Sequence, residues 1–328
     1  MRRRRFIALL GGAAAMLPLT TFAQQPSKIY RVGLLTNGAV LGATDERRTT
    51  LMSVLAARGF VDGQNLSLVQ RSADVHPERL DGLVAELKAA DVDVIVTFGY
   101  PAALAAKLSA KNMPIVVTGA GDPVATGLVD GLARPGGNIT GVTELSTDLS
   151  AKRLEILKDA LPNLGRVAML WNATDLGMTL RYHAAENAAR VLGVKVQALG
   201  VREPDDFEDA FAEMTRERPD AILMVSDALT TLNRKRVVEF ANSNRLPSIF
   251  ETGSIVRDGG LMSYGPKQSE IGELAANLVA RILRGDRPAE LPLELPTRFE
   301  FLVNLKTAQA LGLTLPPTLL ARADEVIE

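Results

Sequence analysis

The chain has no cysteine, only two histidines and a single tryptophan among its 328 residues. Without cysteine it can form neither a disulfide nor a lipid-anchored cysteine near its amino terminus. His76 and His183 lie far apart in the sequence, so no histidine-rich metal-binding spacing is present. The Gly-x4-Gly-Lys-Ser/Thr phosphate loop is also absent. We therefore expect neither a bound metal ion nor a cofactor.

Signatures of enzymes and of nucleic-acid-binding proteins are missing too. Gly260–Gly265 reads Gly-Leu-Met-Ser-Tyr-Gly, which is one residue longer than the nucleophile elbow of serine hydrolases. Four of the 37 basic residues lie in Arg2–Arg5, and the other 33 are scattered among 38 acidic ones, without a basic stripe for a phosphate backbone. We expect a protein that is not an enzyme and binds no nucleic acid, with an enzyme for a small polar substrate as the weaker alternative.

The first 23 residues have the organisation of a signal peptide. Arg2–Arg5 form a basic region, Phe6–Leu19 a mostly apolar run, and Thr21–Ala23 a small-residue cleavage site. The apolar run is shorter than the roughly 20 residues that a membrane span needs. Arg3–Ile7 resembles a twin-arginine export signal, and an ordinary secretory signal is the alternative. Both routes lead to the periplasm, where we expect the protein to reside.

The remaining chain is long enough for two domains, and 47% of all residues are apolar. Strand and helix patterns alternate in each half in the same order. Asp93–Val96 aligns with Asp220–Leu223, and Met113–Val116 aligns with Leu246–Ile249. We therefore predict an α/β protein of two Rossmann-like, three-layer lobes with parallel sheets. Strands are expected at 30–35, 66–70, 92–98 and 115–117, then at 166–171, 194–199, 221–225 and 247–250.

Ligands of parallel α/β sheets bind beyond the carboxyl ends of the strands. This rule selects polar and aromatic residues that follow each expected strand, together with two residues near the expected connections between the lobes. Such a mixture suits a small polar or zwitterionic ligand with an apolar part. The candidate ligand-binding residues are Thr36, Asn37, Phe98, Gly99, Tyr100, Thr118, Asp122, Thr143, Trp171, Asn172, Ser226, Asp227, Glu251 and Tyr264.

Each chemical class among these candidates has a ligand role and a structural alternative. The rings of Phe98, Tyr100, Trp171 and Tyr264 could enclose an aromatic ligand, or each could pack within its own lobe. Asp122 and Asp227 could hold an ammonium group, or could cap turns and helices. The hydroxyls of Thr118, Thr143 and Ser226 could bind a carboxylate beside the N–H groups of a helix start.

Three segments resemble a known family. These are Asp122–Val142, with its Arg-Pro-Gly-Gly-Asn-Ile-Thr-Gly core, then Gly260–Gly265, and Asn304–Leu313. They are similar to signature segments of ABC-transporter substrate-binding proteins related to the tryptophan-binding TrpX proteins. The resemblance implies a type I periplasmic-binding-protein fold, in which three crossovers join two lobes. We place them near residues 141–145, 261–265 and 295–301.

The resemblance also implies a division of the chain and a role. Residues 28–142 and 265–294 would form the first lobe, and residues 143–264 and 295–328 the second. The protein would capture a small ligand, an amino acid of the aromatic or another class, and deliver it to an ABC permease as a monomer. An exported sensor subunit that signals to a membrane receptor is the alternative. A repressor with this fold would begin with a DNA-binding helix-turn-helix, whereas this chain begins with an export signal.

Overall fold

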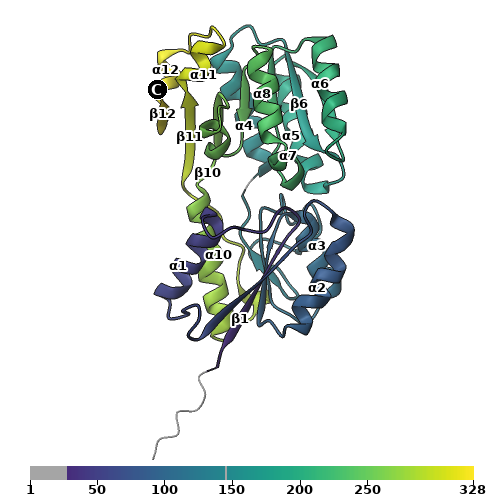
Figure 1. Ribbon diagram of the computed structural model, residues 1–328, viewed down its shortest axis with the longest axis vertical. Coiled ribbons are helices and arrows are strands. Elements are labelled where there is room, and N and C mark those ends of the chain that lie inside the picture. The colour runs from purple at the N-terminus through teal and green to yellow at the C-terminus, as the bar shows by residue number, and fades with distance from the viewer. Residues whose placement is uncertain (1–27, 145) are drawn as a thin grey trace, which may run out of the picture.

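A computed structural model describes residues 28–144 and 146–328 of the protein. The predicted signal peptide, residues 1–23, lies outside the described residues. The described chain forms two lobes that are stacked along the long axis of the molecule (Figure 1). Each lobe has its own sheet, one of five strands and one of seven. We call the part built on the five-stranded sheet lobe I and the part built on the seven-stranded sheet lobe II.

The sheet of lobe I is parallel throughout, with the strand order β2-β1-β3-β4-β5. Its central strand β3 contains Val94, Ile95 and Val96, whose side chains are fully buried because helices cover both faces. Burial on both faces explains why this strand is a near-continuous apolar run in the sequence. The bounds are β1 (Tyr30–Thr36), β2 (Leu66–Ser72), β3 (Val94–Phe98), β4 (Ile115–Thr118) and β5 (Ile139–Gly141).

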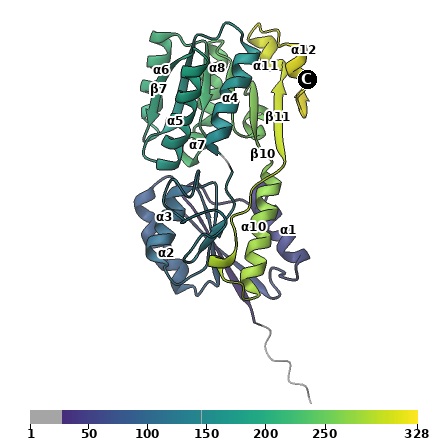
Figure 2. The same cartoon turned by 180° about the vertical axis from the view of Figure 1, so that it is seen from behind.

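The helices of lobe I pack against opposite faces of this sheet. On one face, Leu51 and Leu55 of α1 share a core with Ile271 and Leu278 of α10. On the other face, α2 and α3 enclose a second core. Helix α10 comes from far along the chain, and Figure 2 shows it beside α1 in the lower lobe. The bounds are α1 (Glu46–Ala57), the short helix η1 (Pro77–Arg79), α2 (Leu80–Ala89), α3 (Tyr100–Ser109), α10 (Gln268–Leu283) and η2 (Pro288–Glu290).

The sheet of lobe II repeats the plan of lobe I and extends it. Its order is β12-β11-β10-β9-β8-β6-β7, so β7-β6-β8-β9-β10 matches the five strands of lobe I. All neighbours are parallel except β10 and β11, which are antiparallel. The predicted fold class of two α/β lobes with mostly parallel sheets is confirmed. The bounds are β6 (Arg166–Asn172), β7 (Lys195–Val201), β8 (Ala221–Met224), β9 (Ser248–Phe250), β10 (Met262–Pro266), β11 (Phe299–Asn304) and β12 (Glu325–Ile327).

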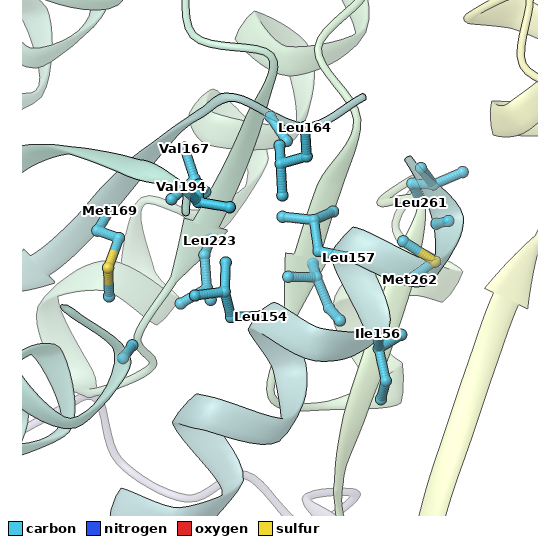
Figure 3. Packing of buried hydrophobic residues seen from close by; sticks show 14 of the residues in the cluster. Leu154, Ile156, Leu157, Leu164, Val167, Met169, Val194, Leu223, Leu261 and Met262 are labelled. Atoms are coloured by element: carbon cyan, nitrogen blue, oxygen red, sulfur yellow. The ribbon is translucent and has the colours of Figure 1, made fainter. Parts of the chain in front are cut away.

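Helices also cover both faces of the lobe II sheet. Leu154 and Leu157 of α4 lie against Val167 and Leu223 of the sheet (Figure 3). The opposite face packs on α6 and α8. Helices α7 and α8 follow one another along the chain and are separated at Asn233. The bounds are α4 (Ser146–Ala160), α5 (Leu176–Val191), α6 (Asp206–Glu217), α7 (Ala228–Leu232), α8 (Arg234–Ser243), α9 (Gly253–Arg257), α11 (Leu305–Ala310) and α12 (Pro317–Leu320).

The chain passes between the lobes three times, and Figure 2 shows these connections close together. It leaves lobe I after β5, where the N–H of Thr143 donates to the carbonyl of Glu294 at 3.0 Å. It returns between β10 and α10, and passes back through the segment before β11. The expected second crossover, 261–265, falls largely within β10, so the chain leaves the lobe II sheet a few residues later. These connections border the space between the two sheets.

Candidate functional site

A cavity of about 310 Å³ lies between the lobes, bordered by the carboxyl ends of strands from both sheets. Its volume is at the lower end of the range for small-molecule sites, which is roughly 300 to 1,000 Å³. Eight of the fourteen residues nominated from the sequence line it, five from lobe I and three from lobe II. These eight are Thr36, Asn37, Phe98, Gly99, Thr118, Ser226, Asp227 and Glu251.

Three of the four nominated rings are not among the lining residues. Trp171 is buried within lobe II, where its ring stacks on Tyr182 with centroids 3.9 Å apart and planes 7° apart. Tyr264 stacks on Phe299 at a centroid distance of 6.2 Å. Tyr100 opens helix α3, next to the lining residues Gly99 and Pro101. Phe98 is therefore the nominated ring that faces the cavity.

The other three nominated residues outside the lining have structural partners. Asp122 accepts hydrogen bonds from the N–H groups of Val124 and Ala125, both at 3.0 Å, as a turn-capping residue does. Thr143 is buried at the first crossover. Asn172 donates to the Asp227 carboxylate at 2.6 Å, so it contacts a lining residue from behind.

Three lining carboxylates cap helices that begin at the cavity. Asp45 caps α1 and also accepts two hydrogen bonds from the Arg47 guanidinium, at 2.7 and 3.0 Å. Asp175 caps α5 through the N–H of Met178 at 3.2 Å. Asp227 caps α7 in a capping box with Thr230. Each carboxylate satisfies N–H groups that lack partners in the first helical turn.

The two lobe II caps are in a different electrostatic state from the lobe I cap. Burial raises the pKa of Asp175 to about 6, and the nearby charge of Asp227 adds to the shift. Burial also raises the pKa of Asp227, against hydrogen bonds that favour its ionised form. Neither carboxylate forms a salt bridge with a described residue. The lobe II wall therefore carries negative charge that a cation could neutralise.

A buried ion cluster forms the part of the lining nearest the crossovers. Glu251 accepts from Arg153 and from Arg181 with different oxygens, both at 2.9 Å. Arg153 also donates to the carbonyl of Tyr264 at 2.6 Å, which ties α4 to strand β10. Both arginine side chains are only 2% exposed. Such a cluster fixes geometry, because each charge depends on its partners once water is removed.

Glu144 is a lining residue that the sequence did not point to. It lies on the first crossover, and its closest cation is Arg181 at 3.9 Å, beyond hydrogen-bonding distance. No described residue donates a hydrogen bond to its carboxylate, and burial raises its pKa. Arg153 and Arg181 were missed as well, because both lie inside helices rather than at strand ends.

The lobe I wall is mostly apolar. It presents Leu41, Phe98 and Ile271, and the Arg47 guanidinium lies 5.4 Å from the centroid of the Phe98 ring. A small apolar recess continues behind the ring, between α1 and α10. The cavity thus has one apolar wall and one charged wall, which suits a ligand with an apolar body and a cationic group.

The lobes touch beside the cavity through small residues. A Cβ atom added to Gly121 of lobe I would lie 3.1 Å from the Cα atom of Gly177 in lobe II. A Cβ atom on Gly38 would lie 3.3 Å from that of Ala228. The two lobes therefore approach each other closely at both points, through backbone at Gly121 and through the Ala228 side chain at Gly38.

Among the described residues, no group of three or more His, Asp or Glu side chains is arranged to hold a metal ion. No described helix is both long and apolar enough to cross a membrane.

Known proteins resemble the chain over most of its length. The family model for ABC transporter substrate binding proteins matches residues 41–327. A tyrosine-binding protein of Clostridioides difficile is 24% identical over 270 residues, which cover 82% of this chain and 77% of that protein.

Solved structures give the same result for the fold. A conserved domain protein of Vibrio cholerae has a TM-score of 0.86 and 27% identity, covering 91% of this chain and all of that one. A Streptococcus pneumoniae ABC domain in complex with L-Trp has a TM-score of 0.85 and 24% identity, covering 92% of this chain and all of that one. The predicted type I periplasmic-binding-protein fold is confirmed, and the chain belongs to the ABC transporter substrate-binding protein family.

Proposed function

We propose that the protein captures an L-amino acid with an aromatic side chain between its lobes and presents it to an ABC permease. Family membership supports the transport role. Relatives named for binding tyrosine or solved with L-Trp support the ligand class. The observation that carries the proposal is the cavity itself, in which an apolar wall containing Phe98 faces a wall with uncompensated carboxylates, Asp175 and Asp227.

The charged ends of an amino acid have partners of opposite charge on the two sides of the cavity. Helix α3 begins at the cavity, and its cap, Gly99, provides no side-chain hydrogen bond. Pro101 has no N–H, and the N–H groups of Tyr100 and Ala102 in the first turn, together with the helix dipole, favour a carboxylate. The acidic wall of lobe II favours the ammonium group. A ligand held in this way would contact both lobes at once.

Contact with both lobes explains capture. Interactions that exist only when the lobes are together shift the population toward the closed form. The backbone contact of Gly121 with Gly177 is compatible with such closure, because neither residue has a side chain to hold the lobes apart. The closed protein would then dock on the permease.

Export to the periplasm as a monomer completes the proposal. The basic and apolar regions of residues 1–23 support export through a signal peptide. A substrate-binding protein acts by holding its ligand, so the role requires no catalysis.

A thermal-shift screen against the amino acids, sugars, nucleosides and small carboxylates tests the proposal. A ligand at about 100 times its Kd should stabilise the protein by about 2.7 kcal/mol. We expect selective shifts with tryptophan, tyrosine or phenylalanine. Shifts with sugars or nucleosides, and none with amino acids, would contradict the ligand class while leaving the two-lobed capture mechanism.

A further inference from the structure

Five carboxylates line the cavity, and four of them accept hydrogen bonds from protein groups. The carboxylate of Asp45 is paired with Arg47, and that of Glu251 bridges two arginines. Both oxygens of Asp227 accept hydrogen bonds, from Thr230 and from Asn172. Asp175 caps α5 and is 2% exposed. The fifth carboxylate, Glu144, accepts no hydrogen bond from any residue that the structure describes.

The Glu144 side chain is also partly exposed to the cavity, so a ligand could reach it. Its side chain is 15% exposed, whereas that of Arg181 beside it is 2% exposed. Arg181 donates its hydrogen bond to Glu251 instead, at 2.9 Å. A desolvated carboxylate without a hydrogen-bonded partner is costly, and a bound cation would remove that cost.

Gly119 lies between the Glu144 carboxylate and the start of α3. Its φ angle is 63°, and a Cβ atom there would lie 3.9 Å from Oε1 of Glu144 and 3.7 Å from the backbone nitrogen of Gly99. A single point is therefore within 4 Å of the free carboxylate and of the start of α3. In an α-amino acid, the ammonium and carboxylate groups are attached to one carbon atom. The Gly99 N–H itself donates to the carbonyl of Thr118 at 2.9 Å, so the ligand carboxylate would lie toward Tyr100 and Ala102 in the first turn of α3. A ligand α-carbon in the cavity over Gly119, at van der Waals distance from its backbone, would have Glu144 on one side and this first turn on the other.

We propose that the Glu144 carboxylate binds the α-ammonium group of the ligand, an inference that rests on the proposed function. The ammonium donates hydrogen bonds to Glu144, and the ligand carboxylate lies toward the first turn of α3. Because Glu144 lies on a crossover, the contact forms at the connection between the lobes. The site selects ligands that carry a cationic nitrogen next to an anionic group.

Isothermal titration calorimetry with three probes tests this assignment on the protein and its Glu144→Gln variant. L-phenylalanine carries both charged groups, phenethylamine lacks the carboxylate, and 3-phenylpropanoate lacks the amine. The variant should bind the two amines about 10- to 100-fold more weakly, the range expected for losing a hydrogen-bonded charge. Its affinity for 3-phenylpropanoate should stay within about twofold of the original, since that probe has no ammonium group. Glu155→Gln on α4 is the matched control, because Glu155 pairs with Lys152 at the surface.

Stability measurements separate loss of the ammonium site from loss of the fold. Burial disfavours the ionised form of Glu144, so Glu144→Gln should unfold at the same temperature as the original protein or higher. Unchanged L-phenylalanine binding by this variant would overturn the inference and leave the proposed function intact. If the original protein does not bind L-phenylalanine, the proposed function is wrong. The role of Glu144 is then tested with phenethylamine alone. Amine binding that Glu144→Gln weakens would keep the ammonium site, and no amine binding would overturn it.

Discussion

The two lobes cap their cavity-facing helices with the same residue type but in opposite electrostatic settings. In lobe I, burial works to raise the pKa of Asp45, but hydrogen bonds from Arg47 outweigh it and the pKa is lowered. In lobe II, burial raises the pKa of Asp175 and of Asp227, and no described cation pairs with either. The negative charge of the lobe I cap is neutralised by Arg47, whereas the two lobe II caps have no cationic partner among the described residues.

The same contrast extends to the rest of the cavity. Lobe I offers Phe98, an apolar wall and the uncapped start of α3. Lobe II offers carboxylates that are held in place by a buried cluster of Arg153, Arg181 and Glu251. One lobe therefore suits recognition of the apolar body of a ligand, and the other suits recognition of its charge.

Removing an arginine from the lobe II cluster should have the largest effect on the stability of the protein. Arg153→Met leaves Glu251 with one cationic partner and the carbonyl of Tyr264 without its donor. We expect the free energy of unfolding to fall by about 3 to 5 kcal/mol, the cost of breaking a buried ion pair on one side. Urea denaturation measures this change. The surface pair of Arg166 and Glu217 provides the control, because Arg166→Met should cost about 1 kcal/mol or less. Equal losses in both variants would mean that the cluster has no special role.

The pH dependence of stability distinguishes the lobe I cap from a lobe II cap. With its pKa raised to about 6, Asp175 binds a proton in the folded protein at pH values where the unfolded chain has released it. Stability therefore falls as pH rises from about 4 through 6, by at most about 3 kcal/mol. Asp175→Asn keeps a capping side chain and should raise the free energy of unfolding at pH 7, with the gain disappearing below pH 4.

Asp45→Asn is the opposing variant in lobe I. Because the pKa of Asp45 is lowered, its ionised form stabilises the folded state, and that stability is lost as the pH falls through the lowered pKa. Asp45→Asn should therefore reduce the free energy of unfolding at pH 7, opposite in sign to Asp175→Asn. Chemical denaturation at pH 7 and pH 4 measures both. Two variants that shift stability in the same direction would contradict the contrast between the caps.

Most of the fold could be predicted because its signals are local. Buried parallel strands such as β3 and β8 appear as short apolar runs, and the two halves repeat them in the same order. Helix α4 is hard to predict from the sequence, because its buried face includes Ser146, Ser150 and Arg153, which interrupt the apolar periodicity. A buried polar face has no distinct pattern in a single sequence.

The site was predictable only as far as it follows strand ends. That rule found Phe98 and Asp227 in the lining, but it also nominated Trp171, whose ring turns into the lobe II core. It could not find Glu144 or Arg181, since one lies on a crossover and the other within α5. Their role depends on contacts between segments that are distant in sequence, and spacing does not encode such contacts.

The smallest expected effect compares one aromatic ring from each lobe. Phe98→Leu removes a ring that lines the cavity and keeps an apolar side chain of similar size. The preference for L-phenylalanine over L-leucine should fall by about 2- to 10-fold, because aromatic pairs contribute about 0.5 to 1.5 kcal/mol beyond burial. Trp171→Phe, which keeps a ring on Tyr182 in lobe II, should leave this preference unchanged. Titration calorimetry with the two amino acids gives the ratio for each variant. If Trp171→Phe lowers the preference for L-phenylalanine as much as Phe98→Leu does, aromatic recognition is not confined to lobe I. The lobe II ring would then act on the ligand indirectly, through the packing behind the charged wall.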